Sequence, residues 1–275
     1  MLGTNRVKYR GRLVQEDSAF AFEEKKRHLE ETSPQLLALL RANNTKLTFF
    51  VTGGLYEACP DIVYNIFDEG HEIGWHGHYH RPIMDIETLK EELSASKKFI
   101  CQFKPKGFRA PWTLLKESYL PILKEVGFVY DSSLFGPAGS YYETNGMKVF
   151  PVTSFPNFGF RKPQYTTNSR YINGLKAFPV GSNFFFSLFR KRYDYLLRFF
   201  EKKSRSCILY IHSWQVFSWP EREMSLVRDK FRYVQKFPLS NVIQYLLSRD
   251  AFLRMDTMLQ DKGPYKGHFL TFDME

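Results

Sequence analysis

A cluster of histidines between His71 and His80 is the part of the sequence whose residue types most clearly suggest chemistry. It places four histidines within ten residues, and His76 and His80 lie four positions apart. Two imidazoles at that spacing, on a helical turn or in a tight loop, can bind one divalent metal ion. Only three further histidines occur in the chain, so the cluster does not follow from composition. The sequence therefore predicts a metal enzyme, which still needs a carboxylate to complete a site of two histidines and one acid.

The elements that must position this cluster alternate between apolar strands and amphipathic helices. A helix is expected from Ser33-Pro34 to about Asn43, because a capping serine precedes a first-turn proline. Asp85 predicts the start of a long helix that ends near Phe103. The expected strands are Lys46–Thr52, Glu72–Trp75, Gly107–Ala110, Phe128–Tyr130, Cys207–His212 and Gly267–Asp273. Repeated strand-helix units of this kind indicate an α/β fold with a mostly parallel sheet and right-handed crossovers.

Residues capable of chemistry follow the carboxyl ends of these expected strands. They are His76 with His80, Arg109, Asp131, His212 and Asp273. In parallel α/β folds the functional groups gather beyond the carboxyl ends of the strands, so we expect these side chains to form one site. Residues 136–181, rich in Gly, Pro, Asn, Ser and Tyr, are expected to be irregular and to supply the walls of its pocket.

Six segments together resemble the polysaccharide deacetylase (NodB-homology, carbohydrate esterase family 4) superfamily. They are, in the family's order, Thr48–Gly53 (TFFVTG), Gly70–Ile73 (GHEI), the pair His76 and His80, Gly107–Trp112 (GFRAPW), Tyr130–Ser133 (YDSS) and Leu209–Trp214 (LYIHSW). They cover roughly residues 34–215, and their combination is specific although each piece alone is weak. The resemblance implies one domain over residues 1–275 with an irregular (β/α)7-type barrel, the NodB-homology fold.

The family's first motif, an apolar strand that ends in Asp-Asp, Asp-x-Asp or Asp-x-Glu, is missing from its usual N-terminal place. The N-terminal acids Glu16, Asp17, Glu23 and Glu24 follow no convincing apolar strand and stay open as alternatives. The C-terminal segment Phe269–Glu275 (FLTFDME) resembles the motif closely. Because the termini of a domain tend to lie close together and tolerate permutation, we expect a circularly permuted member, natural or engineered. The other interpretation is an accidental match at the chain end.

The metal ligands implied by this resemblance are His76, His80 and Glu275. Two imidazoles and one carboxylate accept zinc, and cobalt, nickel or iron are alternatives. His71 is expected to be structural, and His78 a neighbour of the cluster that binds no metal. The ion would activate a water molecule for attack on an acyl carbon.

The catalytic residues implied by the resemblance are Asp273, Arg109 and His212. Asp273 would take the proton of the attacking water, and Arg109 would pair with Asp273 and keep it ionised. His212 would protonate the departing amine. The expected substrate-binding residues are Pro111, Trp112, Asp131 and Trp214. For Asp131 the other interpretation is a structural turn or helix cap formed with Ser132 and Ser133.

The composition restricts the class of protein and its compartment. The chain of 275 residues is 43% hydrophobic and 17% aromatic, which is enough for a packed core, and its net charge of +10 suits an acidic partner. No nucleic-acid-binding motif accompanies that charge. The isolated Cys59, Cys101 and Cys207 indicate a reducing compartment. No apolar signal segment occurs among the first twenty residues, so we expect a cytoplasmic location that still allows peripheral contact with the inner membrane face.

The stretch 184–205 combines aromatic and basic residues. One interpretation is a surface for an anionic glycan or for a membrane face. The other is an ordinary amphipathic helix whose basic side is solvated. The sequence leaves both open.

The function that these residues favour is a metal-dependent N-deacetylase, which removes acetyl from an acetamido sugar in a polysaccharide or glycan precursor. The enzymatic alternative is a deformylase or allantoinase-like hydrolase of a linear C–N amide on the same fold. The non-enzymatic alternative is an inactive glycan-binding pseudoenzyme. Acetate release that is lost on chelation separates the first function from the others.

Overall fold

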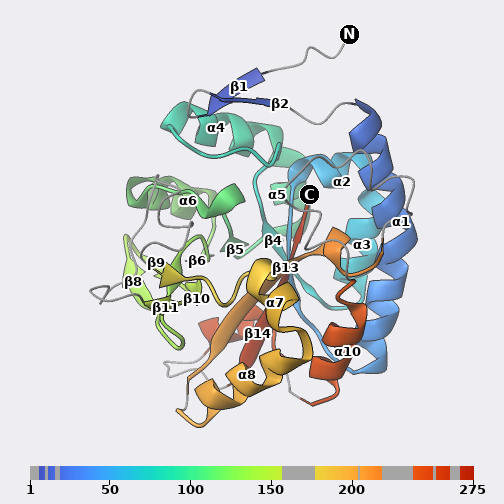
Figure 1. Ribbon diagram of the computed structural model, residues 1–275. Helices are drawn as coiled ribbons and strands as arrows, with labels where there is room; N and C mark the ends of the chain where they lie inside the picture. Colours follow the sequence, from blue (N-terminus) through green and yellow to red (C-terminus); the bar gives the residue numbers. More distant parts are fainter. Residues whose placement is uncertain are drawn as a thin grey trace.

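An eight-stranded sheet is the framework of the computed structural model (Figure 1). The structure describes residues 6–9, 12–15, 19–156, 177–203, 205–218, 238–249, 252–260 and 267–275. The strands of this sheet are β3 (Thr48–Val51), β4 (Glu72–Trp75), β5 (Gly107–Phe108), β6 (Tyr130–Asp131), β8 (Tyr142–Thr144), β9 (Met147–Val149), β13 (Cys207–His212) and β14 (His268–Met274). Shorter pairs are formed by β1 (Arg6–Tyr9) with β2 (Arg12–Gln15), β7 (Phe135–Gly136) with β10 (Val152–Thr153), and β11 (Phe155–Pro156) with β12 (Ala177–Phe178).

The C-terminal strand lies inside the main sheet. The strand order is β13, β14, β3, β4, β5, β6, β9 and β8. All neighbours are parallel except β8 and β9. Asp273 of β14 pairs in register with His212 on one side and with Phe50 on the other. This curled, mostly parallel sheet confirms the α/β fold class expected from the sequence, and it brings the two ends of the motif set side by side.

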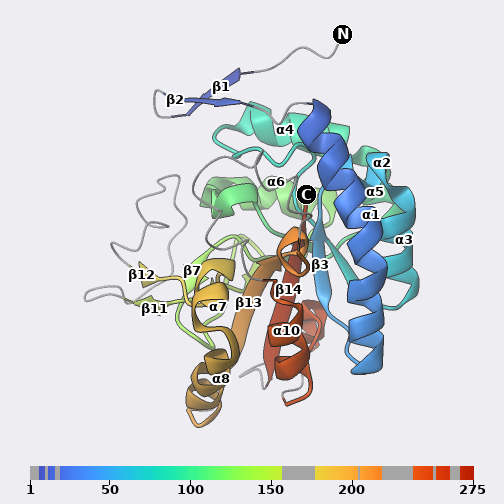
Figure 2. The same ribbon diagram turned by 45° about the vertical axis from the view of Figure 1, so that its right-hand side comes forward.

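Helices cover the outside of the sheet, with α1, α3 and α10 along one flank (Figures 1 and 2). Their bounds are α1 (Ala19–Ala42), α2 (Gly53–Ala58), α3 (Pro60–Asp68), α4 (Ile86–Ala95), α5 (Lys97–Phe103), α6 (Leu120–Val126), α7 (Asn183–Phe189), α8 (Tyr193–Glu201) and α10 (Ser240–Leu247). Asp85 caps α4 as expected, accepting the Thr88 N–H at 2.7 Å, but the long helix predicted to Phe103 is divided at Ser96. No helix within the described ranges is both long and apolar enough to cross a membrane.

The prediction that a helix begins at Ser33-Pro34 is wrong, because α1 starts at Ala19 and contains Pro34. Proline lacks the N–H of a helical hydrogen bond, which normally ends or kinks a helix. Here Leu29, Leu36 and Leu40 recur on one buried face, and their packing into the main hydrophobic core, beside α3 and α10, outweighs that local cost.

The middle of the chain contains more regular structure than expected. Within residues 136–181 the structure describes 136–156 and 177–181, and β8 and β9 there form an antiparallel hairpin that extends the sheet. The turn is Asn145-Gly146, with φ of 52° and 69°. Two residues with positive φ suit the twist of a two-residue hairpin loop, and Asn-Gly is the strongest short signal for one. The Asn-Gly pair therefore marks in the sequence a hairpin that was not among the expected elements.

A buried polar cluster surrounds Glu72 at the amino-terminal end of β4, opposite the carboxyl ends of the strands. Its carboxylate accepts hydrogen bonds from Thr48 Oγ1 (2.6 Å), Tyr130 Oη (2.8 Å) and the Asp256 N–H (2.9 Å). Burial, with the Asp256 carboxylate adding to it, raises the pKa of Glu72 to about 7 despite these donors. Glu72 therefore changes charge near neutral pH inside the folded protein.

We expect the stability of the protein to fall as the pH rises through neutrality because of Glu72. A raised pKa means that the folded state holds the proton more tightly, so this stabilisation is complete below the unfolded pKa and is lost as the pH passes about 7. Relative to Glu72→Gln, the free energy of unfolding of the wild type should drop by on the order of 2 kcal/mol between about pH 5.5 and about pH 8.5. Urea unfolding of both proteins at the two pH values measures this. The exposed Glu125→Gln is the control, and parallel pH profiles for wild type and Glu72→Gln would contradict the prediction.

Candidate metal centre

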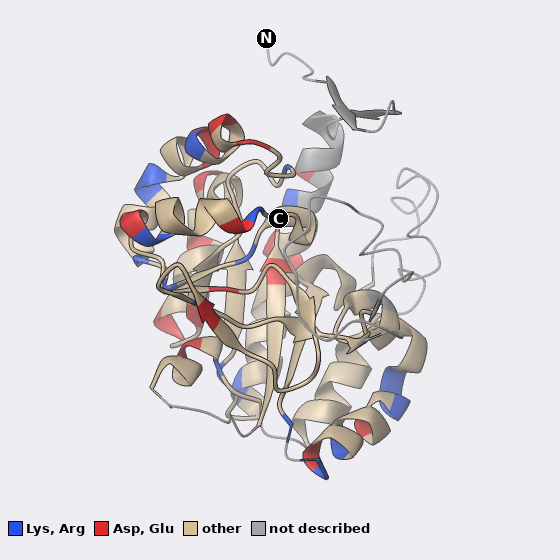
Figure 3. Cartoon of the chain, turned by 90° about the vertical axis from the view of Figure 1, so that its left-hand side faces the viewer, with Lys and Arg blue, Asp and Glu red and all other residues tan. Residues whose placement is uncertain are grey.

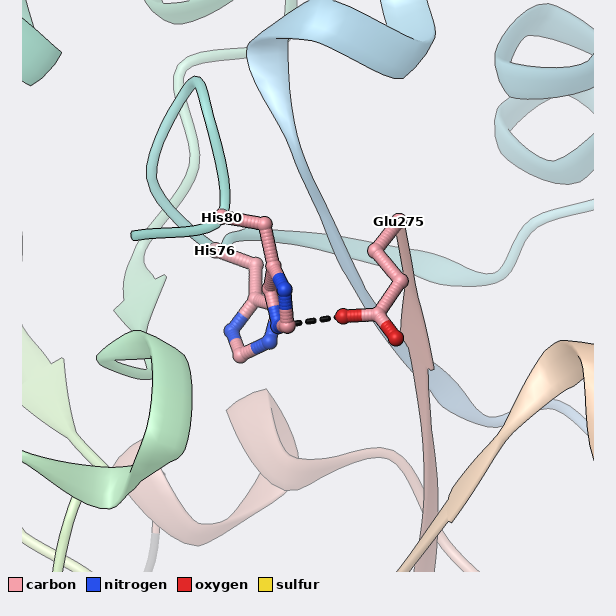
Figure 4. Close-up of side chains that lie close together, drawn as sticks. All are labelled: His76, His80 and Glu275. Carbon is pink, nitrogen blue, oxygen red and sulfur yellow. Dashed lines mark ion pairs between the residues drawn. The ribbon is translucent and has the colours of Figure 1, made fainter. Parts of the chain in front are cut away.

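Three potential ligand groups converge beyond the carboxyl ends of β4 and β14 (Figure 4). His76 and His80 come from the loop after β4, and Glu275 directly follows β14. One ligand atom from each residue lies within 4.8 Å of the other two, and an ion pair joins His80 Nε2 to Glu275 Oε2. Imidazole nitrogens and a carboxylate oxygen form a donor set suited to zinc and similar ions.

The chemical state of His76 fits a metal ligand. Its Nδ1 lies 2.8 Å from the Arg109 carbonyl oxygen, so this nitrogen carries the proton and donates it. Its Nε2 is buried and has no hydrogen-bond partner among the described residues. Burial lowers the pKa of His76 to about 4, although the Asp273 carboxylate opposes the shift. A neutral imidazole with an unprotonated nitrogen near a carboxylate can bind a cation. The donor atoms of these residues therefore suit a metal ion.

Trp214 and His212 contact Glu275, the third potential ligand. The Trp214 indole N–H donates to Glu275 Oε1 at 3.1 Å, and His212 Nδ1 lies 3.7 Å from the same oxygen. The two rings stack at 5.4 Å with an interplanar angle of 14°. Trp214, which the sequence assigned to substrate binding, therefore supports the carboxylate through its indole nitrogen.

Asp273 and Arg109 form a buried ion pair beside the ligand groups. Arg109 Nη1 donates to Asp273 Oδ1 at 2.9 Å, and both side chains are almost completely buried. Arg109 also donates to Thr271 Oγ1, the Ser132 carbonyl and Ser132 Oγ, which satisfies most of its guanidinium. Its charge lies 4.2 Å above the Phe50 ring. Because a buried charge is costly unless it is paired, this network holds Asp273 in one orientation.

Pro111 and Trp112 belong to a strained turn at the edge of the site. Trp112 and Thr113 have φ of 61° and 54°, a left-handed conformation that residues other than glycine rarely adopt. Trp112 is 47% exposed, and Pro111 is buried. Strained backbone of this kind persists where the surrounding structure imposes it, and the substrate-binding role of Trp112 stays a prediction.

Asp131 takes a different position from the other predicted site residues. Its carboxylate is fully buried and accepts hydrogen bonds from the Ser133 N–H and from Ser133 Oγ. Ser133 Oγ in turn accepts the Ala110 N–H at 2.8 Å. Through Ser133, Asp131 therefore supports the backbone at Ala110, which leads into Pro111 and Trp112. Its own carboxylate has no exposed surface that could contact a substrate in this structure.

Glu23 is the one N-terminal acid whose side chain the structure describes, and it is not among the converging ligand groups. Glu16 and Asp17 lie outside the described residues, Glu23 is exposed on α1, and the side chain of Glu24 is not described. His71 accepts the Leu47 N–H through Nδ1, away from the site. Within the described residues, the cluster of His76, His80 and Glu275 is the one group that could hold a metal ion.

One residue that contacts the histidine loop was not among the predicted site residues. Glu92 is completely buried on α4, and its carboxylate accepts the backbone N–H groups of His78 and Tyr79. A signal existed, because Glu92 sits three residues after Leu89 on the inward face of the helix capped by Asp85. An acid on an inward face needs a specific partner.

Comparisons with known proteins point to one family. Residues 14–130 match the family model described as polysaccharide deacetylase. A peptidoglycan-N-acetylglucosamine deacetylase of Bacillus cereus is 32% identical over 100 residues, which is 35% of this chain and 47% of that protein. A peptidoglycan deacetylase of Helicobacter pylori is 32% identical over 106 residues, 37% of this chain and 36% of the other. The chain thus spans less than half the length of these curated relatives.

A solved structure supports the fold. The crystal structure of PuuE allantoinase superposes with a TM-score of 0.51 over 86% of this chain and 80% of the other, at 17% identity. That identity is low enough for the likeness to concern the fold alone. The motif set, the family model that matches residues 14–130 and the relatives named as deacetylases all support the polysaccharide deacetylase (NodB-homology, carbohydrate esterase family 4) superfamily for this chain.

Proposed function

We propose that this protein is a metal-dependent N-deacetylase acting on an acetamido sugar within a polysaccharide, or on a precursor of one. The observation that carries the proposal is the convergence of His76, His80 and Glu275 beside the buried Asp273–Arg109 pair. A metal site next to a separately held carboxylate combines the two functions that amide hydrolysis with water requires.

The residues of the chain divide the reaction between them. A divalent ion held by His76, His80 and Glu275 would supply a water of lowered pKa and polarise the acetyl carbonyl. Asp273 accepts the proton of the attacking water, and the hydrogen bond from Arg109 holds the Asp273 carboxylate in place beside the site. His212, next to the ligand carboxylate and stacked on Trp214, donates a proton to the departing amine.

Zinc is the ion we propose, with cobalt, nickel or iron as alternatives, because two imidazoles and one carboxylate suit them all and availability decides. The relatives from Bacillus cereus and Helicobacter pylori carry names that refer to peptidoglycan, which supports an acetylated amino sugar in a glycan as the substrate. The test measures acetate release from N-acetylated glycan oligomers, with and without a chelator. Formate release from a formamido sugar, or turnover of allantoin without acetate release, would favour the amidase alternative. Metal binding with no turnover would favour the pseudoenzyme.

The order of the motif strands supports circular permutation as part of this proposal. Asp273 and Glu275 complete the first family motif, yet they follow the other motifs in the chain. Strand β14 lies between β13 and β3 and runs parallel to both, which is the position that a first barrel strand would take. A gene in which residues 268–275 precede residues 1–267 through a flexible linker tests this. A folded product with the metal affinity of the original order would support it, and an unfolded one would oppose it.

The helix pair α7–α8 carries a basic and aromatic surface that we assign to contact with an anionic membrane face. In α8 the buried face holds Tyr193, Leu197 and Phe200, so the aromatic residues on the opposite face are not needed for the core. Tyr195 is 74% exposed and Phe199 44% exposed. Basic residues flank α8 in the sequence, namely Arg190, Lys191, Arg192, Lys202, Lys203 and Arg205. Figure 3 shows the Lys and Arg positions of the described chain in blue. Exposed rings next to basic side chains are typical of surfaces that lie on anionic lipid.

We expect the wild type to bind vesicles that contain phosphatidylglycerol and the triple variant Arg190→Gln, Lys191→Gln, Arg192→Gln to lose most of that binding, because each basic residue near the surface contributes about 1 kcal/mol. Vesicle co-sedimentation at low and high salt is the measurement. A variant with glutamine at the exposed Lys90, Lys97 and Lys98 carries the same charge change elsewhere and should bind like the wild type. If the wild type fails to bind anionic vesicles, or both variants bind equally, the helix pair is an ordinary solvated surface.

A further inference from the structure

The loop that supplies both histidines is held on its inner side by the carboxylate of Glu92. This side chain is fully buried on α4. Its Oε2 accepts the backbone N–H of His78 and, at 3.0 Å, that of Tyr79. These two residues directly precede His80. Its Oε1 accepts Arg81 Nε–H at 2.6 Å, one residue beyond His80. One carboxylate thus bonds to residues on both sides of the second histidine.

The other side of the loop is held by the start of α2. The backbone N–H of Gly53 donates to the Gly77 carbonyl at 2.9 Å, and that of Gly54 donates to the His78 carbonyl at 3.1 Å. A Cβ on Gly54 would lie 2.9 Å from the His78 oxygen, so the glycine permits this close approach. The backbone between His76 and His80 is therefore clamped between two glycine N–H groups and one buried acid.

The conformation of His80 shows why such a clamp is needed. Its φ is 52°, in the left-handed region that a residue with a Cβ rarely occupies. A conformation of this kind costs of order 1 kcal/mol or more and persists only where the surrounding structure imposes it. Without the hydrogen bonds to the N–H groups of His78 and Tyr79, the loop would relax and carry the imidazole of His80 away from Glu275.

We infer that Glu92 is a positioning residue that sets the geometry of the metal site by fixing this loop. The inference rests on the proposed metal-dependent function. Glu91 provides the contrast, because it also pairs with Arg81, at 2.5 Å, but it is exposed and makes no hydrogen bond to the loop backbone among the described residues. If the ion pair with Arg81 alone fixed the loop, replacing Glu91 and replacing Glu92 should have similar effects on metal binding.

The experiment compares Glu92→Gln with Glu91→Gln in the full chain. Glutamine at 92 offers one acceptor oxygen, and its NH2 group must face either the loop N–H groups or the Arg81 Nε–H, all of which are donors. Co²⁺ is titrated into metal-free protein and followed by its visible d–d absorption, while thermal unfolding of the metal-free proteins is recorded in parallel. We expect Glu92→Gln to bind Co²⁺ about 10- to 100-fold more weakly and with an altered absorption spectrum, as for other residues that orient metal ligands. Glu91→Gln should match the wild type in both.

The outcomes separate this inference from the proposed function. A wild type that binds no Co²⁺ overturns the metal site itself. If the wild type binds Co²⁺ and Glu92→Gln binds it with equal affinity and an equal spectrum, the role of Glu92 is overturned. The role is also overturned if Glu92→Gln lowers the thermal stability and leaves Co²⁺ binding unchanged. If Glu92→Gln does not fold, Gly77→Ala takes its place, because the added Cβ would lie 3.0 Å from Glu92 Oε2 at a φ of 78°. Unchanged Co²⁺ binding in Gly77→Ala would then overturn the inference.

Discussion

Replacing Asp273 with asparagine should reduce acetate release by about 100- to 10,000-fold, the range that a positioned general base contributes. Asparagine has nearly the shape of aspartate, and its Oδ1 can still accept the Arg109 hydrogen bond at the observed 2.9 Å. It cannot take a proton from water at neutral pH. Initial rates of acetate release from an N-acetylated glycan oligomer, under saturating metal, measure the effect.

Metal binding is the control for Asp273→Asn. Asp273 is not among the three converging ligand groups, so the variant should bind Co²⁺ or zinc with an affinity near that of the wild type. Its thermal stability should decrease, because the buried Arg109 loses its charged partner, and breaking such a pair costs about 3–5 kcal/mol. A folded, metal-loaded Asp273→Asn protein with the wild-type rate would mean that another group is the base.

The sequence predicted the parts of the fold that depend on regular patterns. Apolar runs marked β3, β4, β13 and β14 within one or two residues, because parallel strands that are buried on both faces read as near-continuous hydrophobic runs. The same logic placed the chemistry-bearing residues at one edge of the sheet. The errors occurred where packing overrules local preference, as at Pro34, which the inner face of α1 accommodates within the helix.

Side-chain direction was the part of the site that the sequence could not define. Asp131 and Asp273 both end apolar strands, yet Asp131 points into the hydrogen bonds of Ser133 whereas Asp273 pairs with Arg109. Trp214 was expected to offer a flat surface to a sugar, and the structure adds a contact that its sequence position did not indicate, the indole N–H donated to the Glu275 carboxylate. Glu92 escaped notice because a carboxylate that binds loop N–H groups has no sequence signature apart from its place on a buried helix face. Such roles depend on which neighbours the fold provides.

Replacing Glu275 with glutamine should weaken zinc or Co²⁺ binding by at least about 100-fold, a larger loss than that from residues that only orient ligands. The amide keeps the size of the side chain but loses the charge that offsets the cation, and neutral amides are poor ligands for zinc. Competition with a chromophoric chelator measures the affinity. Trp214→Phe is the graded comparison, because it keeps a ring in place and removes only the N–H donated to Glu275 Oε1, so its loss should be about tenfold.

The ranking of these variants tests the location of the acid as well as its role. Glu275→Gln should bind the metal more weakly than Trp214→Phe does. Both should bind it more weakly than Glu23→Gln, which removes an acid on the exposed side of α1. If Glu275→Gln kept wild-type affinity while an N-terminal acid variant lost it, the ligand carboxylate would come from the other end of the chain. In that case β14 would supply only a structural strand between β13 and β3, and its resemblance to the first family motif would be accidental. The affinity of this one variant therefore decides between a permuted deacetylase site and a coincidence of sequence.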